Sequence, residues 1–462
     1  MLFNSYTYIF FFLPLVFFIY FFLNKKRLVI ASKGFLVFAS LFFYSWWNIS
    51  YLPLILISMI FNYIIGKNIN KNKKIGNKLV LTIGIIANLS LLGYYKYSDF
   101  FLDNINTIFH THYPLLHLTL PLAISFFTFQ QIAYLVDSYK GETKEYNFLN
   151  YALFVTFFPQ LIAGPIVHHK EMMPQFAKIR NKAVNYKNIG YGLFIFSTGL
   201  FKKVMIADYL AKWANAGFDT ATTLNFFEAW STSLAYTFQL YFDFSGYTDM
   251  AIGAALLFNI KLPINFNSPY KAISIQDFWR RWHITLTRFL RDYIYIPLGG
   301  NRVDKLKVYR NIMVTFLLGG IWHGAGWTFV FWGFLHGIAL SIQRIWKSMG
   351  FKMNKFLAWF LTFNFVNIGW VFFRAKDWAD AIKVLKGMAG VNGIVYTESV
   401  YFDRDYLWKF ALLIIFCVVS KNTIEVINIY KLSYKTLIAG IVVLIISILR
   451  LQHVSEFLYF NF

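Results

Sequence analysis

The sequence contains little cysteine and little charge. Its single cysteine, Cys417, lies within an apolar run, Ala411–Ser420, so disulfides, thiolate metal sites and a cysteine nucleophile are poorly supported. Only 14% of the 462 residues are charged, well below the share in ordinary soluble domains, whereas 58% are hydrophobic. So much apolar surface needs lipid, and we therefore expect an integral membrane protein.

Acidic residues are also scarce. The 21 Asp and Glu face 44 Lys and Arg, which gives a net charge of +23. In a soluble protein this excess would suggest a nucleic-acid partner. Here the basic residues occupy loops between apolar runs, so they indicate orientation in the membrane and contact with anionic lipid headgroups. Nucleic-acid binding is not expected.

The apolar runs define the expected fold. Met1–Asn24 carries no charge and lacks the features of a cleaved signal peptide, so we expect it to remain as a first helix. We predict an all-α integral membrane protein, a single polytopic domain over 1–462 with about eleven to thirteen transmembrane or re-entrant helices. The runs lie near 5–24, 34–47, 51–66, 79–95, 115–135, 148–166, 189–210, 229–258, 311–322, 327–345, 356–373, 407–420 and 436–450.

The basic loops predict the topology, because cytoplasmic loops collect Lys and Arg. The first two are separated by two short apolar runs, which places the N-terminus outside, and the acidic loop Val391–Tyr406 indicates that the C-terminus is outside as well. The loops expected in the cytoplasm are Lys25–Arg27, Lys67–Lys78, Lys178–Lys187, Arg302–Arg310, Arg344–Lys355 and Lys421–Lys435.

The most informative stretch runs from Asn265 to Gly300. Ser274 with Asp277 three residues later forms a capping box, so a helix is predicted to start there. At 100° per residue this helix has an apolar side and a basic side, with His283 on the border. The apolar side includes Trp279 and Trp282, and the basic side holds Arg280, Arg281, Arg288 and Arg291.

Two interpretations of this helix are open. It could lie at the membrane interface, with its arginines on lipid phosphates and His283 incidental. Alternatively the helix binds an acyl donor through these arginines and tryptophans, with the arginines on the phosphates of the acyl carrier, because guanidinium groups are planar and permanently charged. On this second interpretation His283 could contact the carrier or the reacting thioester.

Further polar residues interrupt apolar runs. His323, in Gly319-Gly-Ile-Trp-His-Gly324, is either a hydrogen-bonded core histidine or a general base that takes a proton from an attacking hydroxyl. Asp243 and Asp249 could bind a cation, carry protons in a transporter or orient the basic residues, and we favour structural pairing, with Asn267 as further polar support. His168 and His169 are adjacent and point to different sides of a helix, so no metal site is expected.

These blocks together resemble the membrane-bound O-acyltransferase (MBOAT) superfamily, specifically its bacterial branch of alginate and peptidoglycan O-acetyltransferases. The resemblance covers most of the chain, with a core at roughly 115–375 and peripheral helices at 1–98 and 407–450. Ala123 stands where the family commonly has Gly. The blocks that carry the resemblance are Pro121–Gln130, Phe158–Pro165, Asp243–Asp249, Phe278–His283, Arg291–Arg302 and Gly319–Gly324.

The resemblance implies a function. His323 matches the histidine regarded as catalytic, and His283 matches the upstream polar position of the active site. Helices around a central funnel and channel would let a cytoplasmic donor, acetyl-CoA, meet an acceptor from the far side, with no bound cofactor. A periplasmic SGNH-type transferase would complete delivery to an extracytoplasmic glycan. The resemblance also implies that the protein lies in the bacterial inner membrane.

The C-terminal tail holds a further candidate site residue. The tail Glu456–Phe462 resembles aromatic tails of this branch, so Tyr459 is a hypothetical acyl relay, with a plain aromatic membrane anchor as the alternative.

Three other functions are alternatives to acetyl transfer. They are a transporter or flippase of a lipid-linked or anionic substrate, a polyprenyl-dependent glycosyltransferase, and D-alanyl transfer to teichoic acid. A transporter would be expected to show inverted repeats, and we detect none in the sequence.

Overall fold

The computed structural model describes residues 1–69, 76–143, 145, 147–396, 406–430, 433–451 and 457–458. Within these residues the chain forms helices and no strand, which confirms the all-α class. The chain divides into two compact units, which we describe separately. Unit 1 comprises Met1–Leu200, Tyr247–Pro263 and Tyr430–Asn461, and unit 2 comprises Phe201–Gly246, Ile264–Ile429 and Phe462.

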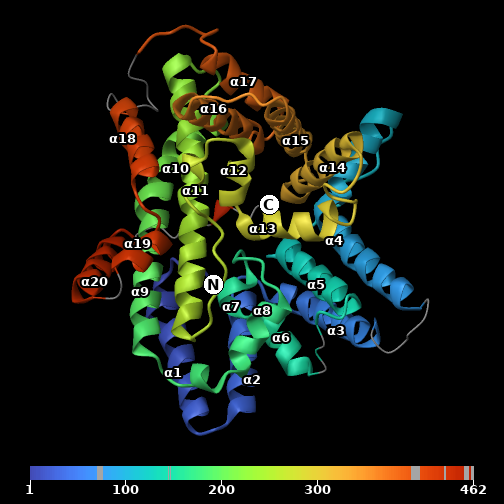
Figure 1. Ribbon diagram of the computed structural model, residues 1–462, viewed down its shortest axis with the longest axis vertical. Coiled ribbons are helices and arrows are strands. Elements are labelled where there is room, and N and C mark those ends of the chain that lie inside the picture. Colours follow the sequence, from blue (N-terminus) through green and yellow to red (C-terminus); the bar gives the residue numbers. More distant parts are fainter. Residues whose placement is uncertain are drawn as a thin grey trace. The chain divides into compact units, whose positions relative to one another are not determined.

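Unit 1 is built from the helices of the N-terminal part of the chain and from one C-terminal helix (Figure 1). They are η1 (Thr7–Phe12), α1 (Leu13–Lys25), α2 (Val29–Ser45), η2 (Ile49–Tyr51), α3 (Leu52–Ile69), α4 (Gly76–Phe109), α5 (Ile124–Tyr139), α6 (Phe148–Thr156), α7 (Phe158–Leu161), α8 (His169–Ala177), η3 (Ile179–Lys182), α9 (Tyr186–Phe201) and α20 (Tyr434–Leu449).

Unit 2 holds most of the remaining helices, and the long helix α11 (Phe226–Leu257) runs through both units. The helices of unit 2 are η4 (Lys202–Ala207), α10 (Asp208–Asn215), η5 (Ala216–Thr220), η6 (Pro269–Lys271), α12 (Ile275–Arg281), α13 (Ile284–Leu290), η7 (Arg291–Tyr295), α14 (Lys305–His323), α15 (Trp327–Ser348), α16 (Lys355–Arg374), α17 (Trp378–Met388), α18 (Tyr406–Val419) and α19 (Thr423–Tyr430).

Several helical stretches are long and apolar enough to cross a membrane. In the described residues there are five, or six if a bent pair counts as one span. The expected eleven to thirteen therefore includes helices that are shorter, bent or more polar, and that number stays a prediction. The five are Thr7–Lys25, Ile49–Ile69, Gly76–Phe109, Tyr186–Thr220 and Lys355–Arg374, and the bent pair is Trp408–Val419 with Thr423–Ile429.

Apolar side chains on these helices point outward. Phe11 and Phe18 of the first stretch are 71% and 68% exposed, and Ile30 of α2 is 78% exposed. Each such side chain would cost about 1.5–3 kcal/mol in contact with water relative to an apolar environment. Because many large side chains share this exposure, the outward faces match lipid, and the chain is a multi-pass membrane protein.

The core of unit 1 holds the described end of the C-terminal tail. Phe457 is buried and stacks on Tyr247 with ring centroids 4.5 Å apart, and Tyr247 stacks on Phe3 at 4.8 Å. Offset stacking of this kind adds about 0.5–1.5 kcal/mol per pair beyond the burial of area. The tail is thus held by aromatic packing, whereas Tyr459, the hypothetical relay, lies outside the described residues.

Helices α14 and α15 of unit 2 pack against each other at two glycines (Figure 1). A Cβ atom on Gly320 would collide with the backbone oxygen of Phe329, and one on Gly333 would collide with that of Phe316. Only glycine lets the two backbones approach so closely. This contact fixes the end of α14, where His323 is the last helical residue.

Candidate functional site

The predicted amphipathic helix begins as expected and then breaks. The Ser274 hydroxyl accepts a hydrogen bond from the Asp277 amide at 3.2 Å, and α12 begins at Ile275. The expectation of one continuous helix through Arg291 is wrong, because α12 ends at Arg281 and His283 has φ 41° and ψ 54°. A left-handed conformation is uncommon for a residue other than glycine, so the break must be held by its surroundings.

Asn265 holds this break. Its backbone oxygen accepts a hydrogen bond from the Ile284 amide at 3.0 Å. Its side-chain oxygen accepts from the amide of Thr285 at 3.1 Å and from the hydroxyl of Thr285 at 2.7 Å. The same oxygen lies 3.3 Å from Nδ1 of His283. A single buried side chain therefore fixes both the start of α13 and the orientation of the imidazole.

These contacts determine the tautomer of His283. The Asn265 atom that accepts from a backbone N–H must be the carbonyl oxygen, so Nδ1 of His283 must carry the proton it donates. Nε2 of the neutral ring is then an acceptor. Burial lowers the pKa of His283 to about 3, and the side chain is 0% exposed. His283 is therefore a neutral imidazole near neutral pH.

His323 lies at the end of α14 in an aromatic setting and is 2% exposed. Its ring is 5.2 Å from Trp332 and 5.0 Å from Phe373 between centroids, and both contacts are edge-on. Trp322 lies 4.9 Å from His323 and 6.3 Å from His283, so the two histidines contact one indole. The structure thus brings the two predicted catalytic histidines into the same part of unit 2.

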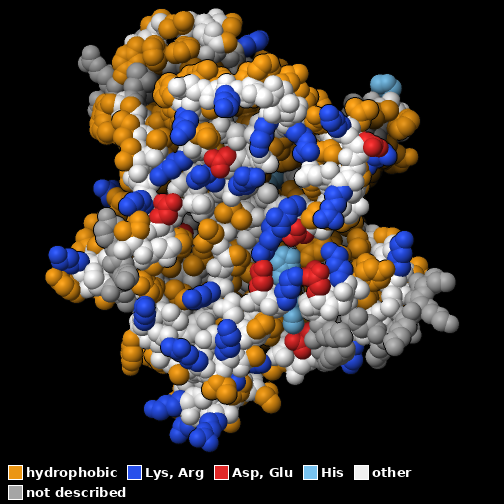
Figure 2. All heavy atoms as spheres, in the orientation of Figure 1, with side chains coloured by type: hydrophobic (Ala, Val, Ile, Leu, Met, Phe, Trp, Pro, Cys, Tyr) orange, Lys and Arg blue, Asp and Glu red, His pale blue; other side chains and the backbone are white. Residues whose placement is uncertain are grey.

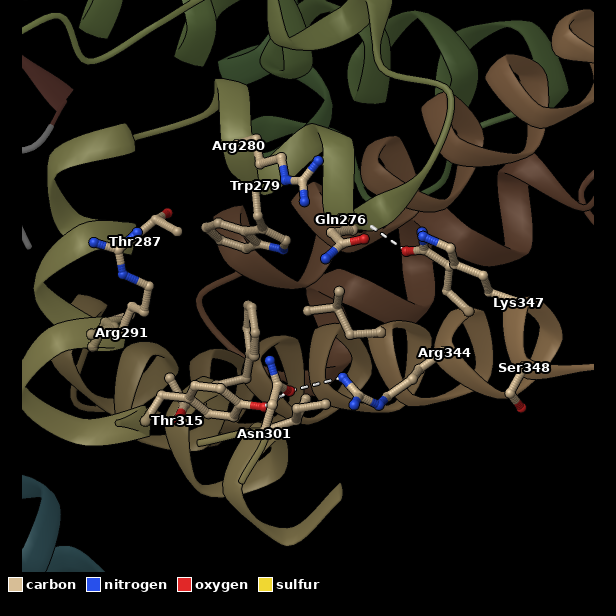
Figure 3. A pocket seen from close by; sticks show the side chains of 16 residues that line it. Gln276, Trp279, Arg280, Thr287, Arg291, Asn301, Thr315, Arg344, Lys347 and Ser348 are labelled. Atoms are coloured by element: carbon tan, nitrogen blue, oxygen red, sulfur yellow. Dashed lines mark hydrogen bonds between the residues drawn. The ribbon is translucent and has the colours of Figure 1, made fainter. Parts of the chain in front are cut away.

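A cavity of about 720 Å³ lies in unit 2 among α12, α13, α14 and α15 (Figure 3). Its lining includes four basic side chains, Arg280, Arg291, Arg344 and Lys347, together with polar and apolar ones. In Figure 3, Trp279 and Arg280 lie across the cavity from Asn301 and Thr315. The remaining lining residues are Gln276, Thr287, Leu290, Tyr295, Ile312, Phe316, Leu340, Gln343 and Ser348.

Only part of the predicted donor-binding set lines this cavity, namely Trp279, Arg280 and Arg291. Arg281 instead forms an ion pair with Asp277 at 2.9 Å and donates to the backbone oxygen of Asn267 at 3.2 Å. Trp282 is buried in the core, 4.8 Å from Trp370 between ring centroids. Arg281 lies on another face of α12, because the residues of this helix that line the cavity, Gln276, Trp279 and Arg280, are spaced three and four residues apart and share one face.

Several lining residues were not predicted. Arg344 and Lys347 come from α15, and Arg344 donates to the side-chain oxygen of Asn301 at 2.9 Å. The sequence pattern predicted 344–355 only as a basic loop. Its charges could have indicated a binding site, but they were interpreted as a sign of membrane topology. On the face drawn in Figure 2, Lys and Arg side chains outnumber Asp and Glu, so charge by itself does not single out this cavity. Asn265 carried no sequence signal beyond its place in the stretch.

The two acids of α11 differ in their surroundings. Asp243, in unit 2, pairs with Lys203 at 2.7 Å, and Lys203 also pairs with Asp208 at 2.8 Å. Both Lys203 and Asp243 are buried, and a buried charge without a partner would cost several kcal/mol. Asp243 thus pairs with a buried lysine. Asp249 is buried in unit 1.

The other polar residues singled out from the sequence also have partners. The side-chain oxygen of Asn267 accepts from Asn422 at 2.9 Å, so it ties the segment before α12 to α19. In unit 1, His168 pairs with Asp137 and His169 with Glu145, each at 3.2 Å. Among the described residues, no group of three or more His, Cys, Asp or Glu is arranged to hold a metal ion.

Comparison with known proteins adds a family match. The model of the membrane-bound O-acyltransferase family (MBOAT) matches residues 138–376, a segment that contains Asn265, both histidines and the cavity.

Several bacterial enzymes are similar to the chain. A peptidoglycan O-acetyltransferase of Helicobacter pylori is 58% identical over 425 residues, 85% of this chain and 81% of that protein. A probable alginate O-acetylase, AlgI, of Pseudomonas aeruginosa is 41% identical over 396 residues, 84% of this chain and 75% of that protein. A teichoic acid D-alanyltransferase of Streptococcus thermophilus is 28% identical over 286 residues, 54% of this chain and 68% of that protein.

Proposed function

Because the chain belongs to the membrane-bound O-acyltransferase family and is an O-acetyltransferase, we propose that it moves acetyl groups from acetyl-CoA to a polysaccharide outside the cell. The observation that carries the proposal is the cavity, whose basic residues suit a phosphorylated carrier. Its lining residue Trp279 contacts Trp332, and Trp332 packs on His323. Peptidoglycan is the favoured acceptor, because the 58% identical relative is a peptidoglycan O-acetyltransferase.

The lining residues fit an acyl-CoA donor. Arg280, Arg291, Arg344 and Lys347 would neutralise its phosphates, since guanidinium and ammonium groups form charge-assisted hydrogen bonds with phosphate oxygens. The side-chain amides and hydroxyls of the wall would bind the amide groups of the pantetheine arm. The apolar wall at Trp279 and Phe316 then favours the uncharged thioester end. No bound cofactor is required.

The chemistry follows from a single proton acceptor. His323 takes the proton of the attacking hydroxyl. At the same time the hydroxyl oxygen adds to the carbonyl carbon of the thioester. A C–O bond forms, the C–S bond breaks, and the leaving thiolate takes the proton back from the imidazolium. His283, neutral with Nε2 as an acceptor, would orient the hydroxyl through a hydrogen bond. A buried setting strengthens these interactions, because little water competes for them.

The orientation supports a cytoplasmic donor. Asn301, Arg344 and Lys347 of the cavity lie beside or within the two basic segments 302–310 and 344–355, which the positive-inside rule places in the cytoplasm. The protein would then reside in the bacterial cytoplasmic membrane with both termini outside. D-alanyl transfer to teichoic acid is less well supported, since that relative is only 28% identical.

Delivery on the outer side would use a periplasmic SGNH-type transferase as partner. Tyr459 is our candidate for an acyl relay to that partner, through an ester on its phenol oxygen. Phe457, two residues earlier, is buried against Tyr247. Undiminished polysaccharide acetylation in Tyr459→Phe, which keeps the aromatic ring, would end the relay hypothesis.

The proposal is tested with membranes from a bacterium that lacks its own copy and expresses the full chain. Radiolabelled acetyl-CoA is added to inside-out vesicles, and label is measured in the polysaccharide as an alkali-labile ester. We expect label that depends on the chain and is reduced by excess unlabelled CoA. Ester formation that continues without a CoA thioester would overturn the donor, and none at all would overturn the reaction.

A further inference from the structure

A third histidine of unit 2 contacts the cavity wall from behind. His336 of α15 is 0% exposed, and its Nδ1 accepts a hydrogen bond from the indole N–H of Trp279 at 3.2 Å. The two rings meet edge-on, 5.1 Å apart between centroids and at 81°. Trp332 and Phe365 pack on the same imidazole at 4.8 and 5.3 Å. The imidazole is therefore fixed on several sides.

This hydrogen bond requires one form of His336. An indole N–H can only donate, so Nδ1 must present its lone pair and the proton of the neutral ring must be on Nε2. A doubly protonated ring would place an N–H donor against the Trp279 donor. The contact therefore selects the neutral Nε2–H tautomer, which is the opposite of the tautomer of His283. His336 is thus built to accept a bond from Trp279.

Trp279 is the residue through which His336 reaches the site. Its indole lines the cavity, and it lies 5.7 Å from Trp332 between ring centroids. Trp332 in turn lies 5.2 Å from His323. Two indoles therefore separate the cavity from His323 along this path.

We propose that His336 is a positioning residue that holds Trp279 as the end wall of the cavity and so sets where the thioester of a bound donor stops relative to His323. This role rests on the proposed function, because it requires the cavity to hold the acyl donor. Loss of the bond would free the indole to rotate, while the cationic residues that bind the phosphates would stay in place. The effect should therefore appear in the rate of transfer and not in the affinity for CoA.

Conservative variants separate this role from simple packing. In His336→Asn the side-chain oxygen lies close to the place of Nδ1 and can accept the same bond, whereas His336→Leu fills similar space without an acceptor. Trp279→Phe keeps a ring in the wall but removes the donor. The two substitutions His336→Leu and Trp279→Phe can also be combined. If each lowers activity to the same extent and the double variant loses no more than either, both losses arise from the same hydrogen bond.

The experiment measures kcat for label transfer from acetyl-CoA in the same vesicles, and the Kd of CoA for the purified full-length protein. We expect His336→Leu and Trp279→Phe to lower kcat about tenfold, since small misplacements of reacting groups are costly. We expect His336→Asn to recover most of that loss, and both His336 variants to bind CoA like the wild type. Melting temperatures identify any variant that fails to fold.

Two results would overturn the role, and they differ. If the wild type binds CoA and transfers label while His336→Leu and His336→Asn are equally active or equally impaired, His336 does not act by accepting a hydrogen bond. If the wild type does not bind CoA, the proposed function fails and this role fails with it.

Discussion

The side-chain oxygen of Asn265 lies 3.3 Å from Nδ1 of His283 and also accepts two hydrogen bonds from Thr285. One buried amide therefore sets the left-handed turn, the ring orientation and the tautomer of the histidine. Asn265 is 18 residues away in sequence, so the turn depends on a tertiary contact. This relationship makes His283 a neutral hydrogen-bond acceptor at Nε2.

Asn265→Asp should shift the pH dependence of acetyl transfer. A carboxylate keeps the acceptor oxygen, but its negative charge favours the protonated imidazole and raises the pKa of His283. Activity should then fall at mildly acidic pH and stay near the wild-type value at alkaline pH. The pH profile of kcat checks this, with Thr285→Ser as a control that keeps the hydroxyl. Superimposable profiles for Asn265→Asp and wild type would contradict the role of Asn265.

Stability should decrease at acidic pH because of His283. Its pKa is about 3 in the folded protein and 6.5 ordinarily, so the unfolded chain binds a proton that the folded chain does not. The contribution of the neutral, buried His283 to stability is complete above pH 6.5 and is lost as the pH falls towards 3. By about pH 5 the loss should reach about 2 kcal/mol.

His283→Asn isolates this effect. Asparagine tolerates positive φ and does not titrate. Between about pH 7.5 and about pH 5, its melting temperature should therefore fall less than that of the wild type. An equal fall in both proteins would mean that the burial of His283 does not govern acid sensitivity.

Close glycine packing should be needed to place His323. Gly320→Ala and Gly333→Ala put a Cβ against a backbone oxygen of the facing helix, so each should cost about 1–3 kcal/mol and lower acetyl transfer. Gly93→Ala of α4 is the control, because a Cβ there meets nothing within 4 Å and alanine favours a helix by up to about 1 kcal/mol. Thermal unfolding in detergent gives the melting temperature of each variant. Equal melting temperatures for the three variants would contradict this packing role.

Arg280→Gln should weaken binding of acetyl-CoA. A charge-assisted hydrogen bond contributes about 1.5–3 kcal/mol, so the KM for acetyl-CoA should rise about tenfold or more. Lys307→Gln removes the same charge from a side chain outside the cavity lining and should leave KM unchanged. The difference should shrink at high salt, because salt screens charges. Equal KM values at low salt would exclude Arg280 from donor binding.

The sequence predicted the class and the start of the site helix, because these depend on composition and on contacts between near neighbours. Trp279 and Trp282, predicted on the apolar side, are indeed buried, and so are Phe278, Leu286, Phe289 and Leu290. The break at His283 was missed because it depends on Asn265, and a 100° periodicity cannot detect a bond from a distant segment. Arg344 and Lys347 were missed as lining residues because only the packing of α12 against α15 brings them to the cavity.

The central claim is that His323 is the proton acceptor in acetyl transfer from CoA. The most direct test compares wild type and His323→Ala in vesicles with radiolabelled acetyl-CoA, and also measures the Kd of CoA for each purified protein. We expect His323→Ala to bind CoA like the wild type and to transfer at least about 100-fold less label to polysaccharide. Transfer by His323→Ala at the wild-type rate, with unchanged binding, would contradict the claim.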